Sequence, residues 1–296
     1  MGVGNLPFNL SDIQTELGST TDTLSGLGLE ATPQLTTPFN MSEFENYVAV
    51  IEGYYRNDGV NDYGQITGGA STNQFGSGRL SVSFWVKQNA GSHHNAQMLN
   101  FAPGFSSSDR IMIDYNTGAG GKLRFNHRQG SGNNLKEYYL NNGGNNSKSG
   151  TGGNWQASNK GNTNGQGWTL LTVTYDGAVS GVGGVNFWWN DQQLDHNAQA
   201  TNGSRSNLAA TNLRVGENIH NVGSAGNAAM DFDKICVYSS ILSASEIQNI
   251  YNNGPKGATL GTPHIEINFN NNTFTDEGTH FSNNGTVNNG GSIQSH

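Results

Sequence analysis

The chain has 296 residues, of which 42 are glycine and 42 are asparagine, so turn-forming residues make up more than a quarter of it. This composition excludes a mainly helical protein and predicts a β-rich chain with many loops. The net charge of −8, with only 14 lysines and arginines, provides no basic surface for a phosphate backbone, and we expect no nucleic-acid partner. The single cysteine, Cys236, excludes an internal disulfide and lies in an apolar run, which predicts a buried thiol.

Residues 1–46 lack the pattern of a domain core. Ser11 with Gln14, and Ser42 with Glu45, have capping-box spacing and predict two short helices on either side of a polar linker. We expect this segment to be a non-globular docking leader, which either wraps over the main domain or docks on another chain. It has neither the charged nor the apolar region of a signal peptide, and no run of 18 apolar residues follows, so we predict no signal peptide and no membrane insertion.

From residue 47 to about residue 240 the hydrophobic period changes to two, the period of half-buried strands, and the predicted domain spans residues 47–254. One face of "RLSVSFWVK" carries four apolar side chains, and two further runs behave in the same way. The pattern predicts an all-β fold, a two-sheet antiparallel sandwich of jelly-roll type. The predicted core positions are Leu80, Val82, Phe84 and Val86, then Leu171, Val173 and Tyr175, then Val185, Phe187 and Trp189, and in the last main strand Ile235 and Val237.

One short helix is predicted after the last main strand. Ser243 and Glu246 form a capping box, while Leu242 and Ile247 have the spacing of a hydrophobic staple. Gly254, followed by a proline, is expected to provide a left-handed cap that ends the helix. We expect this helix to lie across one end of the sandwich.

Five segments, in this order, resemble the laminin-G-like, concanavalin A-like lectin jelly roll. Such domains usually open with a strand and an acidic, glycine-rich turn, which residues 1–46 do not resemble but residues 265–290 do. We therefore predict that residues 255–296 form a C-terminal tail that supplies an extra strand, either to its own domain or to a neighbouring copy. The five segments are "NDGVNDYGQI" (57–66), "LSVSFWVK" (80–87), "WTLLTVTYDG" (168–177), "VNFWWNDQQL" (185–194) and "MDFDKICVYSSILSASEIQNIYNNG" (230–254).

The leader is similar to leaders of structural proteins from tailed bacteriophages, especially those of marine hosts. "NLSDIQTELG" and, later, "MSEFENY" carry this resemblance. It implies a location on the surface of a virion, with other virion proteins as partners of residues 1–46. A leader and a tail without cores of their own also favour a homo-oligomer.

Acidic residues raise two alternatives, catalysis and calcium binding. Glucanases of this fold carry an E-x-D-x-E strand, which is absent here, and the nearest arrangement is Asp231 with Asp233 on one strand face. The laminin-G-like resemblance implies that Asp62, with Asp231 or Asp233, could hold Ca²⁺ as the one cofactor of the protein. Otherwise these carboxylates satisfy turns and loop backbone. The histidines lack zinc spacing, and we expect solvated loops for His93, His94, His127, His196 and His220.

Aromatic residues indicate where a sugar could bind. Trp155, Tyr138, Tyr139 and Trp188 lie in or near predicted loops, or on the strand face opposite the predicted core. Flat rings stack on sugar rings while asparagine and aspartate bond to hydroxyls, although each ring could instead pack on the second side of the sandwich. The leading hypothesis is a non-enzymatic virion structural protein that binds host-surface polysaccharide. The alternatives are a polysaccharide-cleaving enzyme on the same fold and a purely structural subunit.

Overall fold

The computed structural model describes fifteen segments between residues 53 and 295, and the predicted leader, residues 1–46, lies outside them. The described residues are 53–57, 61–69, 79–88, 97–103, 109–116, 122–129, 134–140, 168–179, 184–194, 196–201, 210–216, 230–270, 273–278, 280–281 and 283–295.

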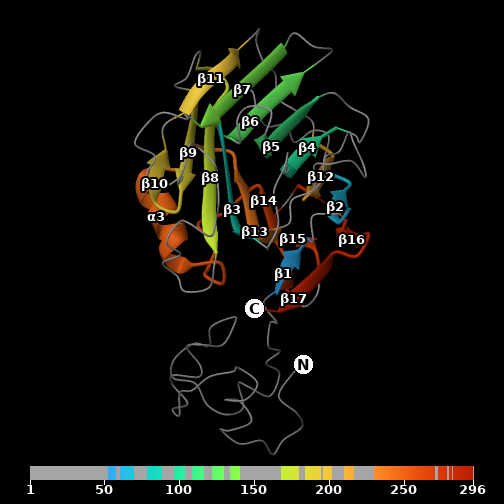
Figure 1. Cartoon of the computed structure of the whole chain (residues 1–296). Helices are drawn as coiled ribbons and strands as arrows, with labels where there is room; N and C mark the ends of the chain where they lie inside the picture. The colour runs from blue at the N-terminus through green and yellow to red at the C-terminus, as the bar shows by residue number, and fades with distance from the viewer. Residues whose placement is uncertain are drawn as a thin grey trace, which may run out of the picture. The chain divides into compact units, whose positions relative to one another are not determined.

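The described chain forms two antiparallel sheets, as predicted (Figure 1). One sheet has nine strands, in the order β10-β9-β8-β3-β13-β1-β17 with β14 and β15 branching from β13, and the other has eight, in the order β11-β7-β6-β5-β4-β12-β2-β16. The nine are β1 (Gly53–Arg56), β3 (Arg79–Gln88), β8 (Thr169–Asp176), β9 (Val185–Trp189), β10 (Gln192–Leu194), β13 (Met230–Tyr238), β14 (Ile265–Asn268), β15 (Thr275–Asp276) and β17 (Ser292–Ser295). The eight are β2 (Tyr63–Thr67), β4 (Gln97–Ala102), β5 (Arg110–Asn116), β6 (Lys122–Gln129), β7 (Asn134–Leu140), β11 (His196–Thr201), β12 (Asn212–Val215) and β16 (Thr286–Asn288).

Alternating apolar side chains place the core between the two sheets. Every core position predicted from the period of two is buried in one cluster, from Leu80 at 0% exposure to Trp189 at 2%. The eight-stranded sheet contributes partners such as Ile66, Leu99 and Phe101 to the same cluster. The prediction of the strand faces is confirmed, because a strand with one buried face must alternate wherever its partner sheet lies.

The predicted C-terminal tail contributes four strands, and in this structure all four pair within the same chain. β14 pairs with β13 and with β15, β16 pairs with β2, and β17 pairs with β1 in the register Tyr55↔Ile293. β16 and β17 are therefore the edge strands of the two different sheets. The tail also adds buried apolar side chains to the core, namely Ile265, Ile267, Phe269, Phe274 and Phe281.

Helix α3 (Ala244–Asn253) begins and ends where the sequence predicts. The Ser243 side chain accepts from the backbone N–H of Glu246, whose carboxylate accepts from the Ser243 N–H, so the capping box is present. Gly254 has φ 75° but ψ 178°, so its positive φ requires glycine while its extended ψ is not that of the left-handed cap predicted. In the described part of the chain, no helix has the length and apolar character needed to cross a membrane.

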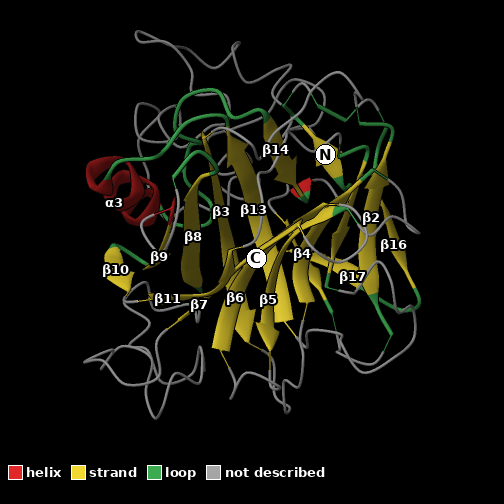
Figure 2. Ribbon diagram, turned by 90° about the horizontal axis from the view of Figure 1, so that it is seen from above, coloured by secondary structure: helices red, strands yellow, loops and turns green. Residues whose placement is uncertain are grey.

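The predicted position of this helix is wrong. α3 packs against the outer face of the nine-stranded sheet, near β8 and β9, rather than across an end of the sandwich (Figure 2). Its Ile247 and Ile250 are buried against strand residues that point away from the main core, and the Tyr251 ring stacks on Trp85 with centroids 6.2 Å apart. The outer apolar cluster also holds Leu170, Cys236 and Tyr238, so the prediction of a buried thiol is confirmed. Burial is the main cause that raises the pKa of Cys236 to about 12. The helix thus covers an outer face that would otherwise expose these side chains to water.

His127 is also misplaced by the sequence analysis. It lies on β6, fully buried, and not in a solvated loop. Its Nδ1 is 3.1 Å from the hydroxyl of Tyr175, and the two rings meet edge to face. A histidine with one hydrogen-bonded partner can fill a core position, which its isolated place in the sequence does not reveal.

A pair of histidines ties the tail to the eight-stranded sheet. His264 Nε2 is 3.0 Å from His280 Nδ1, and His280 Nε2 donates to the carbonyl of Ala210, which precedes β12. A backbone carbonyl only accepts, so His280 Nδ1 accepts from His264 when both rings are neutral. Burial is the main cause that lowers the pKa of both rings.

We expect the free energy of unfolding to fall as the pH decreases from 7.5 to 5.5. The folded-state pKa values lie below the unfolded value of about 6.5, so the unfolded chain binds more protons in this range. The stabilisation is complete above about pH 6.5 and is lost as the pH falls through the folded-state pKa values. The total loss is about 1.4 kcal/mol for each unit by which a folded-state pKa lies below its unfolded value. Urea unfolding at several pH values measures this dependence. His280→Gln should make it shallower, and an unchanged slope would contradict the assignment.

Candidate functional site: the polar outer face of the eight-stranded sheet

The outer faces of the two sheets differ in character. The nine-stranded sheet carries the apolar cluster covered by α3 and, beside it, a row of charged side chains. The outer face of the eight-stranded sheet carries polar side chains on β2, β4, β12 and β16, and α3, the one helix in the described residues, lies on the other sheet. A sheet face lined by amides and guanidinium groups is suited to water or to a polar ligand.

The charged row on the nine-stranded sheet contains the strongest acidic candidate, Asp231. In the sheet register Asp231 lies between Arg56 on β1 and Lys87 on β3. Its Oδ1 is 3.2 Å from Arg56 Nε and its Oδ2 is 3.8 Å from Lys87 Nζ, while the carboxylate itself is fully buried. The hydrogen bond to Asp231 is the main cause that raises the pKa of Arg56 above its ordinary value. Asp231 is thus a paired structural carboxylate here, which is not the environment of a general acid.

Aromatic rings complete this row. The Arg56 guanidinium donates to the Tyr54 hydroxyl at 2.7 Å, and Lys87 Nζ lies 5.4 Å from the Tyr54 ring centroid and 5.5 Å from that of Trp168. The raised pKa of Tyr54 is caused mainly by burial and then by the charge of Asp231. These contacts fix the two cations against the sheet, so the row acts as an ion-paired brace between β1, β13 and β3.

The three carboxylates of the calcium prediction have different surroundings in the structure. Both carboxylate oxygens of Asp231 face cations, so Asp231 does not fit a Ca²⁺ ligand, and within the described segments no three acidic, histidine or cysteine side chains converge. Asp233 is 4% exposed and accepts from the Lys234 N–H at 2.7 Å, as expected of a carboxylate that satisfies local backbone. Asp62 is 2% exposed at the start of β2. Calcium binding through Asp62 or Asp233 stays a prediction.

The described part of the chain places three of the four predicted sugar-stacking residues on strands of two different sheets. Trp188 lies on β9 with its ring on the outer face of the nine-stranded sheet, half-buried against the apolar cluster. Tyr138 and Tyr139 belong to β7 of the other sheet, opposite Phe125 and Arg124 in the register. Trp155 lies outside the described residues. Sugar stacking by Trp155, Tyr138, Tyr139 and Trp188 therefore stays a prediction.

A different set of side chains forms a continuous row on the outer face of the eight-stranded sheet, which we call the polar strip. Its order follows the register across the strands, because residues directly opposite each other in antiparallel pairs share a face. The inward neighbours of these residues, such as Ile66, Leu213 and Val287, pack in or against the core. The polar strip consists of Thr286 and Asn288 on β16, Tyr63 and Gln65 on β2, Arg214 on β12 and Asn100 on β4.

Arg214 organises the polar strip. Its guanidinium lies 4.3 Å from the centroid of the Tyr63 ring and its Nε donates to Gln65 Oε1 at 3.1 Å. The cation–π contact and the hydrogen bond hold three side chains from two strands in one arrangement. Arg214 is only 5% exposed, whereas Tyr63 and Gln65 are half-buried and remain accessible. The buried guanidinium therefore holds the other two side chains in place. The tyrosine ring presents apolar surface to solvent, and the glutamine amide presents polar surface.

The strip also offers unpaired hydrogen-bonding groups. Among the described residues no partner contacts the buried Oδ1 of Asn100, whose Nδ2 donates to Gln97 Oε1 at 3.4 Å. At the other end Asn288 Nδ2 donates to the hydroxyl of Thr286 at 3.2 Å, which leaves the Asn288 carbonyl as an acceptor. Exposure increases from Asn100, fully buried, to Thr286, exposed, so the strip is open at the β16 edge.

The polar strip was not predicted from the sequence, although its alternating pattern is present there. The segment "YGQIT" (63–67) alternates, with Ile66 on one face and Tyr63, Gln65 and Thr67 on the other. The same alternation in "NLRV" (212–215) places Asn212 and Arg214 opposite the core. The missing information was that β2 pairs with β12 and β16, since those strands lie about 150 and 220 positions later in the chain.

Comparison with protein-family models found no match to this chain, and neither did comparison with curated protein sequences. Solved structures with a similar course of the chain include a Bacteroides ovatus protein provisionally assigned to carbohydrate binding, with 11% identity, TM-score 0.48, and coverage of 84% of this chain and 61% of that one. The heptameric SAP-like pentraxin of Limulus polyphemus is 9% identical, with TM-score 0.42 and coverage of 80% and 96%. The CBM40 domain of the Ruminococcus gnavus IT-sialidase is 10% identical, with TM-score 0.43 and coverage of 68% and 96%. These identities and TM-scores are too low to assign a function to this chain.

Proposed function

We propose that this protein is a non-enzymatic structural protein of a virion that binds host-surface polysaccharide through the polar strip. The observation that carries the proposal is the arrangement at the open end of the strip, where the Arg214 guanidinium fixes Tyr63 and Gln65 next to Asn288. The ring contributes an apolar surface for the C–H face of a sugar, and the amides donate to and accept from its hydroxyls. The accessible part of the row, on β2 and β16, offers these groups side by side to neighbouring sugar residues of a chain.

The absence of catalysis in this proposal is supported by the environment of Asp231. A glycosidase requires one carboxyl group that can donate a proton, whereas Asp231 is ion-paired with Arg56 and approached by Lys87. The location on a virion and the docking of residues 1–46 on other virion proteins are supported by the resemblance of the leader alone. Immunoelectron microscopy of the source particle, with an antibody against this chain, tests both.

We expect Gln65→Ala to weaken binding of the recognised polysaccharide about tenfold, because the half-exposed amide offers hydrogen bonds that water must otherwise replace. Tyr63→Ala should weaken it further, since it removes the ring surface and the cation–π partner of Arg214. A glycan array with the full chain identifies the polysaccharide, and isothermal titration calorimetry then compares the variants. Repeating the titration with EDTA shows whether binding depends on calcium.

Gln192→Ala is the matched control, because Gln192 is an exposed strand glutamine on the other sheet. Binding that survives both strip variants would remove the strip from the site. If no glycan binds at all, the protein is a purely structural subunit. Release of reducing sugar that is abolished by Asp231→Asn would instead establish the polysaccharide-cleaving alternative.

A further inference from the structure

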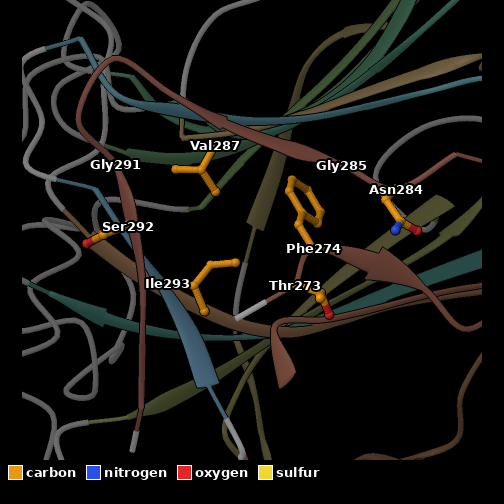
Figure 3. Close-up of a pocket in the computed structure, with 8 residues that line it drawn as sticks. All are labelled: Thr273, Phe274, Asn284, Gly285, Val287, Gly291, Ser292 and Ile293. Carbon is orange, nitrogen blue, oxygen red and sulfur yellow. The ribbon is translucent and has the colours of Figure 1, made fainter. Parts of the chain in front are cut away.

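A second candidate site lies where the edges of the two sheets meet. A pocket of about 390 Å³ opens between β16, the edge strand of the eight-stranded sheet, and β17, the edge strand of the nine-stranded sheet (Figure 3). This volume lies within the range of small-molecule sites, about 300–1,000 Å³. All of the lining residues that the structure places here belong to the C-terminal tail: Thr273, Phe274, Asn284, Gly285, Val287, Gly291, Ser292 and Ile293.

The pocket has an apolar interior formed by three side chains. Figure 3 shows Val287 and Ile293 on opposite sides with the Phe274 ring beside them. Val287 and Ile293 are half-buried, so part of each faces the pocket, whereas Phe274 is only 2% exposed. Phe274 therefore closes the pocket and does not offer a free ring face for stacking. The accessible apolar surface is aliphatic, which suits the C–H face of a saturated ring.

Two glycines keep the pocket open. A Cβ on Gly285 would lie 2.5 Å from the Phe274 ring, and a Cβ on Gly291 would lie 2.9 Å from both the Tyr55 hydroxyl and Val287. Either side chain would displace the residues that line the space. Because glycine has no Cβ, the backbone at both positions can lie close to the apolar side chains of the pocket.

The polar groups of the rim are neutral and include both donors and acceptors. The Asn284 side chain is exposed and has no partner among the described residues, so its amide can both donate a hydrogen bond and accept one. Ser292 Oγ accepts from Gln294 Nε2 at 2.7 Å, which leaves its own hydrogen to donate. The Thr273 hydroxyl donates to the Asn270 carbonyl at 2.7 Å, which leaves its oxygen to accept. No ionisable side chain is among the lining residues that the structure describes.

We propose that this pocket binds a single neutral sugar residue. A sugar hydroxyl both donates and accepts, so it pairs with all three rim groups, and its ring C–H groups contact Val287 and Ile293. A charged ligand would enter without a counter-charge and would lose hydration without compensation. The pocket is distinct from the polar strip, because Thr286 and Asn288 lie on the outer side of β16 whereas Val287 lies on its inner side.

Saturation-transfer NMR and calorimetry on the full chain test this proposal, with the methyl glycosides of glucose, galactose, mannose and N-acetylglucosamine as probes and glucuronic acid as the charged comparison. We expect at least one neutral glycoside to bind and glucuronic acid not to bind. Asn284→Ala should weaken binding about tenfold, since one hydrogen-bonding side chain is lost. Thr273→Trp, at an exposed rim position, should abolish it by filling the mouth. Asn283→Ala is the matched control, because Asn283 is the exposed neighbour of Asn284 outside the lining.

The outcomes separate this pocket from the polar strip. The pocket proposal is supported if Asn284→Ala weakens glycoside binding and Gln65→Ala leaves it unchanged. This holds whether or not the polar strip binds polysaccharide. If none of the four glycosides binds, or if Asn284→Ala and Asn283→Ala bind equally, the pocket proposal is overturned. It is also overturned if glucuronic acid binds as well as the neutral sugars. If Thr273→Trp fails to fold, the comparison of Asn284→Ala with Asn283→Ala still tests the proposal.

Discussion

Removal of residues 265–296 is expected to abolish cooperative folding of the sandwich. The deletion removes β14, β15, β16 and β17 and with them five buried core side chains, Ile265, Ile267, Phe269, Phe274 and Phe281. Burial of each contributes about 1.5–3 kcal/mol, so their joint loss is comparable to the whole stability of a domain, about 5–15 kcal/mol. It also leaves β1 and β2 as new edge strands with unpaired backbone groups. Thermal unfolding followed by circular dichroism measures the result.

A point variant makes the same test without altering the length of the chain. Ile267→Ala should lower the free energy of unfolding by about 2–5 kcal/mol, because the side chain is fully buried on β14. Ile241→Ala is the matched control, since Ile241 is 36% exposed, and a change within about 0.5 kcal/mol is expected there. A truncated chain that melts in one transition within about 5 °C of the full chain would show that the tail is dispensable.

The second large effect is expected at Asp231. Asp231→Ala leaves Arg56 and Lys87 against the sheet without a counter-charge, beside the nearly buried rings of Tyr54 and Trp168. Removal of one partner from a fully buried pair costs about 3–5 kcal/mol, but the Arg56 side chain is 45% exposed and water screens part of its charge. We therefore expect a loss of about 2 kcal/mol in the free energy of unfolding, measured by urea denaturation.

An exposed ion pair provides the control for this experiment. Arg79 and Asp176 also pair across neighbouring strands at 3.2 Å, but their side chains are 69% and 20% exposed. Asp176→Ala should therefore change stability by less than about 1 kcal/mol. In the Arg56→Met background, Asp231→Ala should lower the free energy of unfolding by less, because only the charge of Lys87 is then left without its partner. Equal costs for Asp231→Ala and Asp176→Ala would refute the role of Asp231 as a brace.

The site residues show where sequence reasoning stops. Asp231 and Asp233 are two positions apart on one strand, and their spacing suggested a shared role in catalysis or calcium binding. The structure gives the two carboxylates different partners, because Asp231 pairs with Arg56, 175 positions away, whereas Asp233 accepts from the neighbouring Lys234 N–H. Tyr63 and Arg214 drew no attention as isolated residues, yet sheet pairing brings the guanidinium to 4.3 Å from the ring centroid.

The sequence by itself determined the features that depend on neighbouring residues. The alternation in "RLSVSFWVK" assigned Leu80 and Phe84 to the core, and the spacing of Ser243 and Glu246 placed the start of α3. Both follow from local geometry, since side chains alternate along a strand and a helix leaves its first amide donors unpaired. Only the tertiary structure decided that α3 covers the outer face of the nine-stranded sheet and that His127 is buried beside Tyr175. These outcomes depend on which strands pair across long separations in the chain, and a local pattern of apolar and polar residues is compatible with many such pairings.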